Sequence, residues 1–305
     1  MMDRVGPVAT ILALALATAM AGPRGPGVTA KPSGRTLSDP DAMPLELPVD
    51  FSRPERQQMT AEPANAGSEY FEAAVRGEAW AQTKLGKIYV TTNDPERQQR
   101  GVELLRQAGA QNDAEAIYLL AGLSAEGVGV EQSDVEAFQQ MKRAAELGFA
   151  EAHFALGTMY FEGTGTTQDQ GEALASFRRA AESGSKEGMF AAGDLMLSQP
   201  DPEMRAEGLA LVNRAIESGH IWATLVLATA YGRGSNGLPK DEAKAEALLR
   251  PPAERGDADC QMVLASLYKF GDMFADRRDE AQLWLQRAAD QGQPKALEIL
   301  RWEAK

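Results

Sequence analysis

The chain has 305 residues, of which 44 are acidic and 31 basic, so its formal net charge at pH 7 is −13. This balance argues against nucleic acids and anionic lipid surfaces as partners, because proteins that bind either present a cationic face. It favours a basic partner, or it serves solubility alone. The single cysteine, Cys260, excludes a framework of disulfide bonds.

The first residues have the pattern of a secretory signal peptide. Arg4 lies in a short leading region, residues 8–18 form an apolar core, and residues 19–21 read Ala-Met-Ala, an A-x-A cleavage site. The apolar run is too short to span a bilayer comfortably, which disfavours the alternative of an uncleaved anchor. We therefore expect residues 1–21 to be a signal peptide. The mature chain would then be periplasmic or secreted, without stable membrane insertion.

The next segment, residues 22–67, is rich in proline, glycine, serine and charged residues and shows no helical periodicity. This composition is typical of a flexible linker, or of a tether that becomes ordered on a partner. Its most apolar part is PLELPVDF, residues 44–51. That part could dock back on the rest of the chain, although a plain linker is the simpler interpretation.

From Ser68 onward the sequence repeats itself every 35 to 37 residues. One copy, residues 150–184, predicts a helix over 151–161, a glycine-containing loop, and a second helix over 171–182. A small residue opens each first helix, and a glycine or asparagine follows each second helix with the same spacing. The opening positions are Ala81, Ala116, Ala152, Gly188, Ala223, Cys260 and Ala296. The closing positions are Gly77, Asn112, Gly148, Gly184, Gly219, Gly256 and Gly292, which suits a left-handed helix terminus.

The copies LGTMYFEGTGTTQDQGEALASFRRAAESG and AEGVGVEQSDVEAFQQMKRAAELG resemble the Sel1-like repeat family, a relative of the tetratricopeptide repeats. The resemblance covers residues 68–305. It implies an all-α fold, an α/α right-handed superhelical solenoid of about six helix-pair repeats with half-repeat caps. Two copies replace the glycine loop with TTNDPERQQ and SQPDPEMR. One second helix contains Pro251 and Pro252, which should kink or shorten it.

The sequence predicts no catalytic, metal or cofactor site. There are only two histidines, His153 without a second one nearby and His220 in a turn, where a structural role is favoured; a zinc site needs three or four converging ligands. Ser183 and Lys186 match S-x-x-K, but the motif straddles a helix end, so the serine and lysine do not share a helix face. Cys260 takes a slot filled elsewhere by alanine or glycine. It is interpreted as a buried small side chain rather than as half of an intermolecular disulfide. We therefore expect a protein that is not an enzyme.

If the small residues of the first helices pack inward, the positions one before and two, six and nine after them should face an open groove. The groove is then an aromatic ladder edged with carboxylates, suited to a protein that brings basic and apolar groups. The alternative is that the aromatic side chains are packing between repeats. The predicted partner-binding residues are Trp80, Glu115, Tyr118, Glu151, Phe154, Thr158, Phe161, Glu187, Phe190, Asp194, Trp222, Leu225, Asp259 and Met262.

A non-enzymatic, exported, protein-binding solenoid is thus the predicted function. The resemblance suggests an immunity or inhibitor protein that neutralises a basic toxin or effector, such as a secreted phospholipase of a type VI system. It also allows a periplasmic regulator or an assembly adaptor for a signalling or polysaccharide-export complex. Hydrolysis of β-lactams, proposed for cysteine-rich relatives, is less favoured because this chain has a single cysteine.

Overall fold

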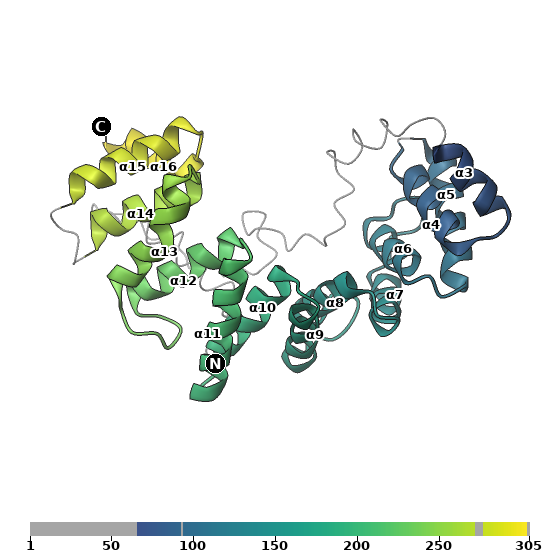
Figure 1. Ribbon diagram of the computed structural model, residues 1–305, viewed down its shortest axis with the longest axis horizontal. Coiled ribbons are helices and arrows are strands. Elements are labelled where there is room, and N and C mark those ends of the chain that lie inside the picture. The colour runs from purple at the N-terminus through teal and green to yellow at the C-terminus, as the bar shows by residue number, and fades with distance from the viewer. Residues whose placement is uncertain (1–65, 93, 272–276, 304–305) are drawn as a thin grey trace, which may run out of the picture. The chain divides into compact units, whose positions relative to one another are not determined.

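The computed structural model describes residues 66–92, 94–271 and 277–303, and this part of the chain contains fourteen α-helices and no strand (Figure 1). The predicted signal peptide and nearly all of the predicted linker lie outside the described residues. The first described helix begins at Ala66, slightly before the predicted start of the solenoid at Ser68.

The helices fall into two compact units, and the division between them lies at Gly188 and Met189. The first unit contains α3 (Ala66–Val75), α4 (Ala79–Val90), α5 (Pro95–Ala110), α6 (Ala114–Glu126), α7 (Asp134–Glu146), α8 (Ala150–Glu162) and α9 (Gln170–Glu182). Helix α10 (Lys186–Leu197) crosses the division. The second unit continues with α11 (Pro202–Glu217), α12 (Ile221–Arg233), α13 (Glu242–Glu254), α14 (Ala258–Phe270), α15 (Arg278–Asp290) and α16 (Pro294–Glu303).

Within each unit the helices pack as successive pairs. The most extensive contacts join α4 to α5, α6 to α7 and α8 to α9 in the first unit, and α12 to α13 and α14 to α15 in the second. Each pair also contacts the first helix of the next, as α7 contacts α8 and α13 contacts α14. The predicted all-α solenoid of helix pairs is therefore confirmed.

The closing residue of every pair has the predicted left-handed backbone. The six closing glycines have φ between 81° and 102°, and Asn112, the one non-glycine among them, has φ 63°. Asparagine tolerates this conformation better than most residues with a side chain. The amide oxygen of Asn112 also accepts a hydrogen bond of 2.9 Å from the guanidinium of Arg143. The repeat spacing of the sequence thus marks real helix ends.

The two helices of a pair differ in how much of their surface is buried. In α6, every residue from Ala116 to Ser124 is buried, whereas α7 buries only Ala137, Met141, Ala144 and Ala145. The sequence explains the difference, because α6 is apolar on all sides and α7 is apolar on one side only. A helix that is apolar all round is stable only when it is covered all round. The first helices therefore form the interior of each unit.

Two pairs, α4–α5 and α10–α11, differ from the others in the same way. In both, the glycine loop between the two helices is replaced, by TTNDPERQQ and SQPDPEMR respectively. Their second helices have 16 residues instead of 13, and each begins with an Asp-Pro pair. The carboxylates of Asp94 and Asp201 each accept a hydrogen bond of 3.0 Å from a backbone amide of the first turn. An extra turn of helix thus replaces the glycine loop.

The two adjacent prolines do not shorten their helix, so the expectation of a shorter helix is wrong. Helix α13 has 13 residues, like α7 and α9, and it contains Pro251 and Pro252 in its last turns. Its end is closed by the amide of Arg255, which donates to the carbonyl oxygen of Pro251 at 3.2 Å. Hydrogen bonds beyond the prolines therefore still complete the helix.

Candidate partner-binding surfaces

The predicted aromatic ladder is buried, so the prediction that it lines an open groove is wrong for most of its members. The buried members are Tyr118, Phe154, Thr158, Phe161, Phe190, Asp194, Leu225 and Met262. The aromatic ring of Tyr118 lies 4.8 Å from that of Phe149, and the ring of Phe190 stacks at 5.1 Å on His220. Phe149 and His220 precede the first helices of later pairs, so the alternative interpretation, packing between repeats, describes these side chains correctly.

The aromatic ladder is buried because of the composition of the first helices. The groove prediction assumed one buried face and one open face, but these helices are apolar all round and are covered on more than one side. Thr158 illustrates the result, because its side chain is buried and its hydroxyl donates a hydrogen bond of 3.2 Å to the carbonyl oxygen of Phe154 in the same helix. Side chains in this position therefore stabilise the stack and are not presented to a partner.

The residues just before the small opening residues remain accessible. Trp80 is 50% exposed, Glu151 and Asp259 are exposed, and Glu115, Glu187 and Trp222 are half-buried. Four of them, Trp80, Glu115, Glu151 and Glu187, belong to the first unit and occur once per helix pair. We call these four residues the acidic row. It is the accessible part of the predicted binding site in the first unit.

Local contacts hold several members of the acidic row. The indole N–H of Trp80 donates to Glu78 at 2.8 Å, and Trp80 packs edge-on against Tyr70 with 6.0 Å between ring centroids. Glu115 forms an ion pair of 3.0 Å with Lys84, and the hydroxyl of Ser185 donates to Glu187 at 3.1 Å. Exposed ion pairs of this kind add little stability, so the row can exchange these contacts for a partner.

Asp194 differs from the other predicted residues because it is a buried carboxylate. It is 1% exposed, and neither carboxylate oxygen has a hydrogen-bond partner among the described residues. Burial alone raises the pKa of Asp194 to about 7. The carboxyl group therefore holds its proton more tightly than an exposed aspartate does, and because it is buried it is not available to pair with a basic partner at the surface.

The candidate catalytic residues have structural surroundings. His220 caps α12, with its Nδ1 accepting a hydrogen bond of 3.0 Å from the amide of Ala223. Cys260 is fully buried, and burial is the main cause that raises the pKa of its thiol, which disfavours the reactive thiolate. Ser183 closes α9 and donates to the carbonyl oxygen of Arg179, whereas Lys186 begins α10, so the two residues do not share a helix face.

Two further findings concern metals and membranes. Among residues 66–92, 94–271 and 277–303, no three or more histidine, cysteine, aspartate or glutamate side chains lie close enough together to hold a metal ion. Over the same ranges, no helix combines the length and the apolar character needed to cross a membrane.

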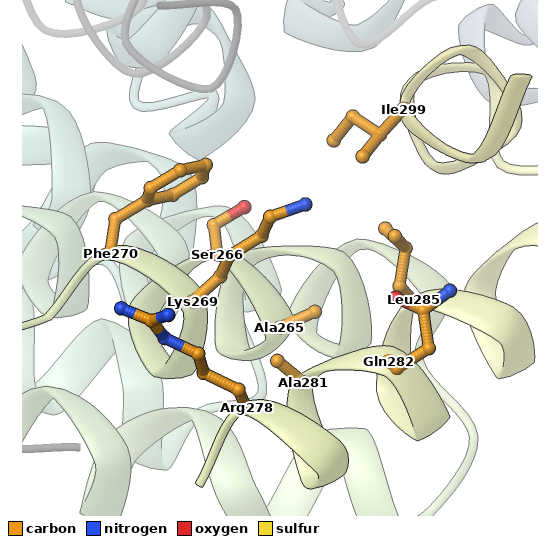
Figure 2. A pocket seen from close by; sticks show the side chains of 9 residues that line it. All are labelled: Ala265, Ser266, Lys269, Phe270, Arg278, Ala281, Gln282, Leu285 and Ile299. Atoms are coloured by element: carbon orange, nitrogen blue, oxygen red, sulfur yellow. The ribbon is translucent and has the colours of Figure 1, made fainter. Parts of the chain in front are cut away.

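One surface feature escaped the sequence reasoning, a pocket between α14, α15 and α16 that is lined by Lys269 and Arg278 together with apolar side chains (Figure 2). The signal in the sequence was the register of Lys269. It lies nine residues after Cys260, and the corresponding position holds Val90, Ala125, Phe161, Leu197 or Gly232 in other first helices. Lysine is the only charged residue among these six equivalent positions, and lysine is rarely fully buried, which indicates that this position reaches solvent.

The repeat itself identifies the family. A model of the Sel1 repeat matches residues 81–113, 114–149, 150–185, 223–257 and 258–293, which is more than half of the chain. The chain belongs to the Sel1 repeat family. The unmatched residues 186–222 include the variant pair α10–α11, whereas the first match, residues 81–113, covers all but the first two residues of the other variant pair, α4–α5. Sel1 repeat proteins are generally protein-interaction solenoids and typically non-catalytic scaffolds, which supports the predicted class of function.

Two solved structures of Sel1 repeat proteins are similar to this one. The first is c5321, a protective antigen present in uropathogenic Escherichia coli strains that displays an SLR fold. It is 25% identical, with a TM-score of 0.65, over 77% of this chain and 50% of c5321. The second is a Sel1 repeat protein from Oxalobacter formigenes. It is 29% identical, with a TM-score of 0.57, over 73% of this chain and 86% of that protein. The chain thus matches about half the length of c5321. None of the curated proteins matches the sequence.

Proposed function

We propose that this Sel1 repeat protein is an exported, non-enzymatic inhibitor that binds a basic effector protein through the acidic row. The observation that carries the proposal is the regular spacing of the row. Trp80, Glu115, Glu151 and Glu187, which all lie in the first unit, recur at equivalent positions near the start of successive first helices, while the small residue that follows each of them is buried. A partner with basic and apolar side chains at a matching spacing can contact all four.

The physical chemistry supports a preformed site. Helices that are buried along most of their length have little freedom left to lose, so binding need not order the backbone. A half-exposed tryptophan beside carboxylates is a common kind of anchor in protein interfaces. The net charge of −13 would also speed the encounter with a cationic partner.

The inhibitory role rests on two supports. The sequence carries a predicted signal peptide, which would bring the chain to the periplasm or outside the cell, where exported effectors act. The acidic surface suits an inhibitor that covers a basic enzyme such as a secreted phospholipase. A periplasmic regulator or assembly adaptor would use the same row, and the identity of the partner distinguishes the two roles.

The test starts with capture of partners from the source cells by the mature chain, followed by affinity measurements with the recovered protein. The variant Trp80→Ala with Glu115→Gln and Glu151→Gln should weaken binding at least about tenfold, because each anchor or charge contact contributes on the order of 1 kcal/mol or more. Raising the salt concentration should weaken binding of the unmodified chain as well.

The matched control replaces two exposed glutamates on second helices of the same unit, Glu146→Gln with Glu182→Gln. This control has a similar net charge but an intact row, and its affinity should stay within about twofold of the unmodified chain. Equal weakening of both variants would contradict the row as a specific site. An inhibitor must also abolish the toxicity of its partner on co-expression; a partner from a signalling or export complex, with no toxicity to suppress, would indicate an adaptor.

A further inference from the structure

Helix α3 carries two apolar side chains on a face that is polar in the other second helices. Phe71 is 54% exposed and Val75 is 72% exposed. They lie four residues apart in one helix, so their side chains are neighbours on the same face. We call Phe71 and Val75 the α3 patch.

The repeat supplies the comparison that makes the α3 patch unusual. Phe71 lies six residues before the closing residue Gly77, and the equivalent positions hold Arg106, Lys142, Arg178, Asn213, Arg250 and Gln286. Val75 lies two residues before Gly77, and the equivalent positions hold Ala110, Glu146, Glu182, Glu217, Glu254 and Asp290. All of these positions are exposed or half-buried. Packing within the solenoid therefore does not account for two large apolar side chains there.

The contacts of α3 with the rest of its unit use a different face. Ala73 and Ala74 are buried in a core cluster with Ala81 and Leu85 of α4. Exposed apolar side chains that form a pair at one place, rather than being scattered singly, are typical of a surface that something else covers. Covering the α3 patch is favourable in proportion to the apolar area that it removes from water.

We infer that residues 44–51 of the same chain, PLELPVDF, dock on the α3 patch. This segment is the most apolar part of the chain between the predicted cleavage site and α3. Every second residue in it is apolar from position 45 on, namely Leu45, Leu47, Val49 and Phe51. It can therefore place several apolar side chains on one side and keep Glu46 and Asp50 on the other.

The length of the intervening chain allows this docking. Residues 52–65 separate the segment from Ala66, the first residue of α3. Fourteen residues can span up to about 46 Å, at about 3.3 Å per residue. The rise of α3 from Ala66 to Val75 is only about 14 Å. The segment can thus reach the α3 patch without a fully extended connection.

The covalent connection also favours this occupant over a second copy or a separate protein. A segment on a short linker is present at its target at an effective concentration in the millimolar range. A weak apolar contact is then enough for docking within one chain. A free partner at a much lower concentration needs a correspondingly higher affinity for the same two side chains.

The test is cross-linking of the full mature chain with a short bismaleimide, after introduction of two cysteines. One chain carries Asp50→Cys with Glu72→Cys, and the other carries Gln58→Cys with Glu72→Cys; Glu72 is exposed next to Phe71. In an undocked linker the Gln58 pair should react about twofold faster, because its loop is shorter. If the segment docks, the Asp50 pair should react at least about tenfold faster than the Gln58 pair. Cys260 is buried and the pKa of its thiol is raised, so it should not compete for the reagent.

Variants of the patch connect the cross-link to α3. Phe71→Lys with Val75→Glu gives α3 the residues that α7 has at the equivalent positions, which are compatible with a second helix. This change should slow cross-linking of the Asp50 pair at least about tenfold. The matched control is Val135→Glu, which replaces another exposed apolar residue on a second helix of the same unit and should leave the rate unchanged. Equal rates in these two variants would overturn the inference.

A second variant changes the segment and leaves α3 intact. Leu47→Ser with Val49→Ser should slow the cross-link as much as the patch variant does, and circular dichroism shows whether the helices are retained in each case. Faster reaction of the Gln58 pair than of the Asp50 pair would identify a plain linker and overturn the inference. Cross-linked dimers in place of the intramolecular product would assign the α3 patch to a second copy and would also overturn it. The α3 patch shares no residue with the acidic row, so failure of either experiment leaves the other proposal standing.

Discussion

At the scale of single residues, Asp194 shows how one substitution in a repeat changes the energetics of burial. The equivalent positions in other pairs hold Thr158, Thr229 and Ser266, whose hydroxyls donate to the carbonyl four residues earlier, at 3.2, 2.7 and 3.0 Å. A carboxylate in the same place can accept but not donate until it is protonated. Asp194 therefore occupies a position that suits a hydroxyl.

We predict that Asp194→Thr stabilises the protein at pH 8. The folded-state pKa of about 7 lies above the unfolded value of 3.8, so the folded state binds the proton more tightly. The destabilisation is absent below the unfolded pKa, grows between the two values, and is complete above pH 7, where it is on the order of 4 kcal/mol. Urea unfolding at pH 8 should show a gain of stability that shrinks steadily as the pH is lowered toward 4.

The reverse substitution provides the control. Thr158→Asp places a carboxyl group at the equivalent buried position of α8, so it should destabilise the chain at pH 8 and recover part of the stability as the pH falls. If the effect of Asp194→Thr is the same at pH 5 and pH 8, the carboxyl group does not titrate in the folded state as described.

At the scale of helices, the variant pairs show why small residues recur where first and second helices cross. A Cβ atom added to Gly193 would lie 2.7 Å from the carbonyl oxygen of Gly208, and one added to Gly208 would lie 2.7 Å from that of Gly193. Gly86 and Gly101 approach each other in the same way in α4 and α5. These glycines set the distance between the two helices of a pair.

We predict that Gly193→Ala destabilises the protein by about 1–3 kcal/mol, because the new methyl group meets backbone atoms that cannot move aside. This is opposite to the usual effect of Gly→Ala inside a helix, which stabilises by up to about 1 kcal/mol. Gly232→Ala is the matched comparison in α12, since its nearest atom beyond the helix would be 3.5 Å away. Chemical denaturation of both variants measures the difference. Similar shifts for the two would contradict the role of Gly193 in helix spacing.

At the scale of the whole molecule, each helix pair within a unit contacts its neighbours in the chain, so stability should be local. In such proteins the free energy is approximately a sum over repeats and the interfaces between adjacent repeats. Leu105 and Leu264 are both fully buried, the first in the unit up to Gly188 and the second in the unit from Met189. They allow the two units to be perturbed separately.

We predict that Leu105→Ala lowers hydrogen-exchange protection mainly in α4 to α7, and that Leu264→Ala lowers it mainly in α12 to α15. Each cavity should cost about 2–5 kcal/mol. Hydrogen exchange followed by mass spectrometry measures both patterns, and each variant serves as the control for the other. An equal loss of protection throughout both units would mean that the chain unfolds as one cooperative block.

The sequence by itself determined the architecture, because helix ends depend on local chemistry. A left-handed closing residue such as Asn112 and a capping aspartate such as Asp94 act within a few residues of the chain, so their spacing can be read directly. The same spacing showed which family the repeat resembles. The accessible positions of the predicted binding site, such as Trp80 and Glu151, could also be predicted from the sequence, because they lie at the start of each first helix.

Only the tertiary structure decided which surfaces are open. A helical pattern shows that Phe154 and Asp194 lie on one face, but not whether a neighbouring helix covers that face. Burial depends on contacts between residues far apart in sequence, and it placed both side chains in the interior. The same kind of contact decided a different outcome at Lys269, which is half-buried and lines a pocket between three helices. Packing between repeats, which no single repeat encodes, therefore separates interior positions from candidate binding sites.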